Sequence, residues 1–243
     1  MDEQSEIVSL SFYRFGGIGA RTWAFTQMLF ARFAMAKIER IGFWKLFGSG
    51  TGEGFTPLPN TAVYAILATW PSVEAAQGAL EKTHVFQRYR AVSRESWTVF
   101  LATSAARGAW DGREPFHPVD TSDSGGPLAA LTRATIRPSI LLRFWKRVPS
   151  ISRAIGMDRN VMFKIGLGEV PWFHQVTFSI WPDTSSMSRF ARTDGPHAKA
   201  IKAVREGKWF KEELYARFRI LEDSGTWNGA SPLGTLTDGA VSR

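Results

Sequence analysis

The sequence predicts an α+β protein in which two ferredoxin-like βαββαβ units, duplicated within one chain, form a fused dimeric α+β barrel. Strand and helix patterns occur in the same order in both halves of the chain. Short motifs also recur in register, Trp70-Pro71 as Trp181-Pro182 and Trp110-Asp111-Gly112 as Trp227-Asn228-Gly229. A four-stranded antiparallel sheet leaves one apolar face bare, and the other half of a duplicated chain is the simplest cover for it.

The two halves are expected to meet in a polar segment rich in proline and glycine, 111–126, which is typical of a linker. The halves are then an N-terminal one, 1–118, and a C-terminal one, 119–243. Hydrophobic periodicity and turn signals define their elements. In the N-terminal half, strands are expected at 7–15, 43–47, 62–70 and 97–102, and helices at 23–39 and 72–94. In the C-terminal half, strands are expected at 128–136, 161–166, 173–181 and 216–221, and helices at 139–156 and from 194 onward.

Two glycine-rich segments resemble nucleotide-binding loops only superficially. The cluster at 16–20 joins a strand to a helix, but Thr22 stands where a dinucleotide fingerprint needs a small residue, and no acidic ribose ligand follows. The loop at 48–55 lacks the Gly-Lys-Ser/Thr ending of a phosphate-binding loop. We interpret the first as a turn and the second as a hairpin connection.

Composition narrows the classes of ligand. The 243 residues include 10 Trp and 18 Phe against 4 Tyr, which favours large apolar pockets with few hydroxyl partners. The absence of cysteine excludes disulfides, thiolate-ligated haem, covalent c-type haem and cysteine-ligated iron–sulfur clusters. This composition suits a ligand that is large and either flat or apolar.

The formal charge of +8 indicates an anionic partner. Because the Lys and Arg residues are spread along helices without the basic and aromatic runs of RNA-binding proteins, we expect no nucleic acid and favour a membrane surface or an acidic protein. The first twelve residues lack the pattern of a signal peptide, and no apolar run of spanning length occurs. The expectation is a cytoplasmic protein, either soluble or peripheral to the inner membrane.

His197 is the strongest candidate for a metal ligand on sequence grounds. It follows Asp194 and Pro196, which suit the start of a helix, and lies in line with Ile201 on the apolar side of that helix. A helix N-terminus disfavours the imidazolium, and neutral imidazole is the form that binds iron. The alternative is a histidine of the core or of the helix cap.

Other polar candidates lie on and between the strands at 161–166 and 173–181. His174 is expected either to face the same cavity as His197 or to be a hydrogen-bonded strand residue. Lys164 and Glu169 flank the turn between these strands and are either a solvated pair or part of a pocket. His84 occupies the position equivalent to His197 in the first half but follows no helix-start signal, so we interpret it as a surface histidine.

Seven segments, taken together, resemble the spheroidene monooxygenase family, the acyclic carotenoid ketolases of purple bacteria. They are VSLSFYRF (8–15), FWKLFGSG (43–50), GEGFTPLPNTAVYAIL (52–67), ESWTVFLA (95–102), FKIGLGEVPWFHQVTFSIWPD (163–183), GPHAKAI (195–201) and KWFKEELYARFRIL (208–221). The resemblance extends over nearly the whole chain except its ends and the expected linker.

The resemblance implies an enzyme of carotenoid biosynthesis that uses dioxygen, haem b and electrons from ferredoxin to oxygenate the terminal C-2 position of acyclic carotenoids. With cysteine absent, a haem must be held by His, Tyr or Met, and His197 is the best placed to be the axial ligand of its iron. Further cofactor contacts are expected from Phe163, Trp172 and Ile201. The polar residues expected to hydrogen-bond dioxygen or relay protons to it are Lys164, Glu169, His174 and Gln175.

The partners implied are an acyclic carotenoid or another apolar small molecule and an acidic ferredoxin, which the positive charge complements. The integral-membrane di-iron ketolases are excluded, because they need more histidines than the four present. A haem lyase similar to aldoxime dehydratase and a haem- or carotenoid-binding protein without turnover remain as alternatives. The sequence leaves the oligomeric state open, including a homo-oligomer.

Overall fold

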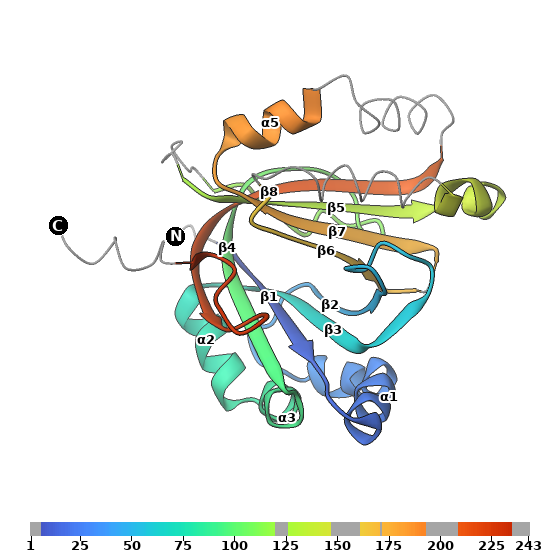
Figure 1. Ribbon diagram of the computed structural model, residues 1–243. Coiled ribbons are helices and arrows are strands. Elements are labelled where there is room, and N and C mark those ends of the chain that lie inside the picture. Colours follow the sequence, from blue (N-terminus) through green and yellow to red (C-terminus); the bar gives the residue numbers. More distant parts are fainter. Residues whose placement is uncertain (1–5, 120–125, 147–160, 171, 193–208, 235–243) are drawn as a thin grey trace. The chain divides into compact units, whose positions relative to one another are not determined.

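A computed structural model describes residues 6–119, 126–146, 161–170, 172–192 and 209–234 (Figure 1). The strands are β1 (Ile7–Arg14), β2 (Trp44–Gly50), β3 (Pro59–Trp70), β4 (Glu95–Gly108), β5 (Leu128–Ile136), β6 (Phe163–Gly168), β7 (His174–Trp181) and β8 (Phe210–Gly225). The helices are α1 (Ile18–Met35), α2 (Val73–Lys82), α3 (His84–Val92) and α5 (Thr184–Arg192), with a 3₁₀ turn η1 (Pro138–Ile140). The strands follow one another in the order β1-β3-β2-β6-β7-β5-β8-β4 around a closed barrel, which confirms the predicted α+β barrel class.

The duplication is visible in the strand register. In the first half β1 pairs antiparallel with β3 and β4, and in the second half β5 pairs antiparallel with β7 and β8. Ile7 lies opposite Trp70 in the first set, and Leu128 lies opposite Trp181 in the second. The two tryptophans that the repeat matched in sequence therefore occupy the same register position in their sheets.

The second repeated motif forms a tight turn in each half. Trp110 bridges to Arg113, and Trp227 bridges to Ala230. Asp111 and Asn228, which follow the two tryptophans, both adopt positive φ, 53° and 60°, a conformation that aspartate and asparagine tolerate better than most residues. The start of the segment expected to be a linker is therefore an ordered turn.

The described residues group into two compact units that exchange segments of the sequence. The first comprises residues from Met1–Gly48, Thr61–Thr103 and Ile220–Arg243, and the second comprises residues from Ser49–Asn60 and Ser104–Arg219. The division into halves at 118/119 stays a prediction about independent folding.

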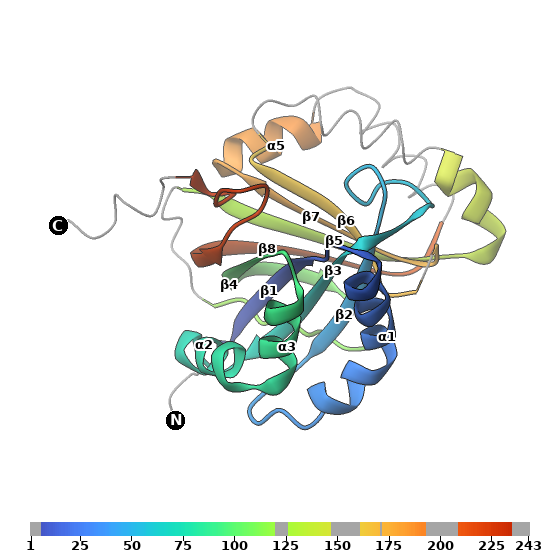
Figure 2. The ribbon, with the colours of Figure 1, turned by 60° about the horizontal axis from the view of Figure 1, so that its bottom comes forward.

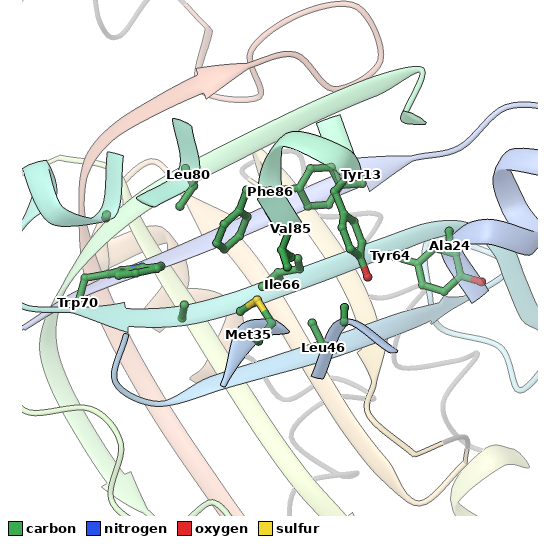
Figure 3. Close-up of a cluster of buried hydrophobic side chains, with 14 of the residues drawn as sticks. Tyr13, Ala24, Met35, Leu46, Tyr64, Ile66, Trp70, Leu80, Val85 and Phe86 are labelled. Carbon is green, nitrogen blue, oxygen red and sulfur yellow. The ribbon is translucent and has the colours of Figure 1, made fainter. Parts of the chain in front are cut away.

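The first unit has an aromatic core between its sheet and its helices (Figure 3). Tyr13 and Tyr64 come from the sheet and Phe86 and Tyr89 from α3, and all four are buried. The ring centroids of Tyr13 and Tyr89 are 5.0 Å apart, within the range in which tilted aromatic pairs attract. Burial is the main reason that the pKa values of both tyrosines lie well above the usual range.

The second unit is built on the sheet of β6, β7, β5 and β8, with α5 packed against β7. Its core includes Leu131, Phe178 and Phe218, which are almost fully buried. Helix α5 begins where Asp183 accepts a 2.7 Å hydrogen bond from the backbone N–H of Ser186, as an N-cap residue does.

Several element boundaries differ from those expected. Helix α1 starts at Ile18, not Trp23, and ends at Met35, not Glu39. The single helix expected at 72–94 is two helices, because Thr83 is extended (ψ 135°). His84 is therefore the first residue of α3, which begins without a side-chain cap, and its side chain is exposed, as expected of a surface histidine.

The last strand is longer than expected. It begins at Phe210 instead of Ala216, because Leu214, Ala216 and Phe218 alternate as buried residues with exposed ones in a period of two. Of the helix expected at 139–156, residues 141–146 are helical and 147–156 lie outside the described residues. The helix expected from 194 onward also lies outside them.

Candidate active site

The sheet of the second unit has two chemically different faces. Because side chains alternate along a strand, the pairing registers assign each residue to one face. The face that we call the open face carries Lys164, Gly166 and Gly168 on β6, Gln175, Thr177 and Ser179 on β7, Ala130, Thr132 and Ala134 on β5, and Glu213, Tyr215 and Arg217 on β8. The opposite face carries Phe163, His174, Val176, Phe178, Leu131, Arg133 and Phe218.

The open face has small side chains where the first unit has large ones. The strand registers place Ala134 in the position of Tyr13 and Gln175 in that of Tyr64. Both tyrosines are buried, whereas Ala134 and Gln175 are half-buried and the neighbouring Thr132 is exposed. Where aromatic rings fill the first unit, the described residues of the second unit thus carry small or polar side chains, while Met187 of α5 packs against Leu128 and Trp181 at the other end of the same face.

The Ala, Thr, Ser and Gly residues that β5, β6 and β7 place on this face leave room for a flat molecule. Large aromatic side chains would occupy the space that such a ligand needs, and binding sites combine apolar walls with a few placed polar groups. The polar groups that β5 and β7 offer there are the amide of Gln175 and the hydroxyls of Thr132, Thr177 and Ser179, of which Ser179 already accepts from the indole N–H of Trp181. The residues present therefore fit a planar cofactor such as a haem.

A buried polar cluster lies on the opposite face. The guanidinium of Arg133, whose side chain is 0% exposed, pairs with Glu212 and, at 3.2 Å, with Asp111. It also lies 5.6 Å from the ring centroid of Trp110. The indole N–H of Trp110 donates to Oε1 of Glu169 at 2.5 Å. A charged residue buried this deeply is stable only with such partners.

His174 extends this cluster. Its Nδ1 lies 3.7 Å from Oε2 of Glu169, whose side chain is 7% exposed. That separation is too long for a hydrogen bond, and Nδ1 is buried with no hydrogen-bond partner in the described part of the chain. His174 and Glu169 thus lie side by side on the face opposite to Gln175.

Glu212 is held as a carboxylate by the turn that follows Trp110. The backbone N–H groups of Asp111 and Gly112 donate to it at 3.0 and 2.8 Å. Burial alone would raise the pKa of its carboxyl, but these two hydrogen bonds and the Arg133 charge hold the pKa below its usual value. The charge of Arg133 is therefore compensated at neutral pH.

Lys164 contacts the hairpin loop that joins β2 to β3. Its Nζ lies 2.8 Å from Oε2 of Glu53 and 5.4 Å from the ring centroid of Phe55. The same loop approaches β6 closely, since the N–H of Gly166 donates to the carbonyl of Glu53 at 2.8 Å. The glycine-rich loop thus positions Lys164 at the edge of the open face.

Site residues expected from the sequence lie on two different faces of the sheet. Lys164 and Gln175 lie on the open face, whereas Phe163 and His174 lie on the opposite face, with Glu169 beside His174. Trp172 lies in the β6–β7 turn at 46% exposure and donates its indole N–H to the carbonyl of Pro57 at 2.9 Å. His197 and Ile201 lie outside the described residues, so their roles stay predictions.

Sequence analysis missed the cluster around Arg133. One signal was available, because Leu131, Arg133 and Ala129 alternate along β5 and so place the arginine on an apolar face. Within the described ranges, no group of three or more metal-binding side chains is positioned to hold an ion. No helix in those ranges is long and apolar enough to cross a membrane.

The fold belongs to the class of fused dimeric α+β barrels. A solved aldoxime dehydratase superposes with a TM-score of 0.62 at 11% identity, over 100% of this chain and 90% of that one. Another, in complex with butyraldoxime, gives 0.62 at 10% identity, over 97% of this chain and 87% of that one. At this level of identity the likeness concerns the fold alone.

The sequence comparisons are more specific. A spheroidene monooxygenase of Cereibacter sphaeroides is 50% identical over 230 residues, 94% of this chain and 71% of the relative. The enzyme of that name from Rhodobacter capsulatus is 48% identical over 231 residues, 94% of this chain and 96% of the relative. A third, from Rubrivivax gelatinosus, is 33% identical, over 86% of this chain and 80% of the relative. No protein-family model matches the chain. The chain belongs to the spheroidene monooxygenase family.

Proposed function

We propose that the protein is a haem-dependent monooxygenase that hydroxylates or ketolates acyclic carotenoids at the terminal C-2 position, using dioxygen and electrons from ferredoxin. Membership of the spheroidene monooxygenase family supports the carotenoid substrate and the monooxygenase class. The open face of the second unit supports the cofactor, because it carries Ala134 and Gln175 where the first unit carries the buried rings of Tyr13 and Tyr64.

In this proposal haem b would bind against the open face, and His197 would hold its iron. The bound cofactor supplies dioxygen activation, which the side chains of the chain cannot supply. Thr177 and Ala134 leave room for the ring, and Gln175 offers an amide that can hydrogen-bond on this face. Lys164, at the edge, carries a positive charge that suits the carboxylate groups of a haem.

The pair formed by His174 and Glu169 is assigned a different task. It lies on the face opposite to Gln175, and Glu169 is fixed by its bond from Trp110. We assign it a proton-holding role, in which the His174 imidazole exchanges a proton between Nδ1 and the Glu169 carboxylate. His174, the other histidine considered as a ligand, would not reach iron bound on the open face, which favours His197.

Ferredoxin is proposed as the electron donor because the chain carries a formal charge of +8 and ferredoxins are acidic. Electrostatic attraction of this kind raises association rates most at low ionic strength. The rate of reduction by ferredoxin is therefore expected to fall steeply with added salt. Reduction by a small neutral reductant is expected to change little over the same range.

Histidine substitutions test the cofactor proposal. His197→Ala is expected to lose most bound haem and the spectrum of the ferrous carbon monoxide adduct. His84→Ala and His117→Ala are controls that keep both, since these two side chains are exposed. Full haem with an unchanged spectrum in His197→Ala, together with loss in His174→Ala, would make His174 the ligand and would contradict the placement of haem on the open face.

Oxygen dependence tests the class of reaction. A monooxygenase consumes dioxygen together with the carotenoid and stops when air is excluded. A haem lyase similar to aldoxime dehydratase needs no external electrons and turns over without oxygen. Product formation from a carotenoid by the ferrous protein in the absence of oxygen would therefore contradict the proposal.

A further inference from the structure

Helix α1 exposes an apolar stripe that is unusual on a protein surface. Ile18, Phe25, Leu29 and Phe33 are exposed at 85%, 67%, 60% and 67%, and Phe30 at 59%. The first four follow the spacing i, i+7, i+11 and i+15, which places them along one side of a helix. Exposed apolar side chains that gather in this way mark an interaction site more often than single ones do.

The rest of the first unit holds α1 by its other side. Ala24, Ala31 and Met35 are at most 2% exposed and form part of the buried core. Helix α1 contacts α3, beside which it lies in Figure 2. The helix is thus anchored along one side and presents four large apolar side chains on the other, so the stripe is not needed for the core.

The charged side chains on α1 itself are all positive. Arg21 and Arg32 are exposed, and their Nε groups bond to carbonyls of neighbouring backbone, those of Gly16 at 2.7 Å and Met28 at 3.0 Å. From residue 7 to residue 38 the chain contains no Asp or Glu. An apolar stripe bordered by arginine and free of carboxylates complements a surface that combines hydrocarbon with negative charge.

We propose that α1 is a membrane-docking helix that lies in the interface of an anionic lipid bilayer, with Phe25, Leu29 and Phe33 inserted among the acyl chains. The choice of lipid over a protein partner rests on the proposed function, because a carotenoid substrate dissolves in the bilayer and not in water. The arginines then lie at the level of the lipid phosphates. No helix of the described residues is long and apolar enough to cross the bilayer.

Vesicle binding by the full-length protein tests this proposal without carotenoid or turnover. We expect the protein to sediment with phosphatidylcholine vesicles that contain phosphatidylglycerol, and less with phosphatidylcholine alone. Phe25→Ser/Phe33→Ser is expected to weaken binding by about tenfold or more, because each buried phenyl group contributes favourable transfer free energy. Leu142→Ser is the matched control, since Leu142 is 80% exposed on another segment.

A charge variant tests the electrostatic part. Arg21→Glu/Arg32→Glu is expected to lower binding to anionic vesicles by about tenfold or more and to leave binding to neutral ones unchanged, since basic side chains near the surface are attracted to anionic lipids. Lys82→Glu/Arg88→Glu makes the same change of net charge on α2 and α3 and is expected to have a smaller effect.

Three results would overturn the proposal. They are a wild-type protein that does not bind anionic vesicles, α1 variants that bind as wild type does, and a Leu142→Ser loss as large as that of the phenylalanine variant. A wild-type dimer that the α1 variants convert to monomers, with vesicle binding unchanged, would instead identify α1 as a contact between copies. Turnover of carotenoid in detergent by the α1 variants tests the proposed function separately.

Discussion

Substitution of Glu212 by glutamine is expected to destabilise the protein far more than the equivalent substitution of Glu95. Both carboxylates hold the tight turn of the repeated tryptophan motif, Glu212 through Asp111 and Gly112, and Glu95 through Gly229 at 2.7 Å. The two sites differ in how deeply the arginine that pairs with each carboxylate is buried, and this difference sets how much stability each substitution removes.

Arg133, the partner of Glu212, has a side chain that is 0% exposed, whereas Arg14, the partner of Glu95 at 3.2 Å, is 32% exposed. Removing one partner of a buried ion pair costs about 3–5 kcal/mol, because the remaining charge stays buried. Asp111 still compensates part of the Arg133 charge, so we expect about 3 kcal/mol for Glu212→Gln. Water can solvate Arg14, so Glu95→Gln is expected to cost about 1 kcal/mol or less.

Urea unfolding and thermal melting followed by circular dichroism measure both variants. For a chain of this size, about 3 kcal/mol corresponds to a fall in Tm of about 6–12 °C, and about 1 kcal/mol to a fall of about 2–4 °C. Asp111→Asn serves as a control that weakens the Arg133 cluster from its exposed side. Equal losses for Glu212→Gln and Glu95→Gln would show that burial of Arg133 does not govern the stability of its cluster.

Two further predictions concern pH and the hairpin loop. Burial raises the pKa values of Glu95 and Glu212, but hydrogen bonds and the neighbouring arginines outweigh it and hold both pKa values below the ordinary 4.5. The two carboxylates therefore stabilise the fold above about pH 4.5, and their contribution is lost as the pH falls below that value. Measurement of Tm as a function of acid pH tests this prediction. Gly54→Ala is expected to lower the free energy of unfolding in urea by at least about 2 kcal/mol. The reason is that Gly54 has a φ of +91° and an added Cβ would come 1.8 Å from the carbonyl oxygen of Gly166. Gly48→Ala, where an added Cβ meets nothing within 4 Å, is the control expected to stay near wild type.

The duplication could be predicted because its repeated motifs can be recognised within a single sequence. Trp70 and Trp181 close equivalent strands, and the tight turns need aspartate, asparagine and glycine at positive φ. Strand alternation also placed most strands correctly. The break at Thr83 escaped prediction, because Thr83 interrupts an otherwise continuous helical pattern without glycine or proline.

The candidate site could be predicted only in part. The residues around β6 and β7 were correctly located along the chain, but the face on which each lies depends on pairing register, and one position of shift reverses it. Gln175 and His174 are neighbours in sequence and lie on opposite faces. The Arg133 cluster joins residues from β5, β8 and the turn after β4, and such contacts between distant segments cannot be read from local patterns.

The central claim is that the open face of the second unit binds haem. Haem titration followed by the Soret band tests it with Ala134→Tyr/Gln175→Tyr, which restores the side chains that Tyr13 and Tyr64 supply in the first unit. Gln87→Tyr, at an exposed position of α3, is the control. We predict that the double variant stays folded and loses the Soret band that wild type and control develop. Haem binding by the folded double variant with wild-type affinity and spectrum would contradict the claim.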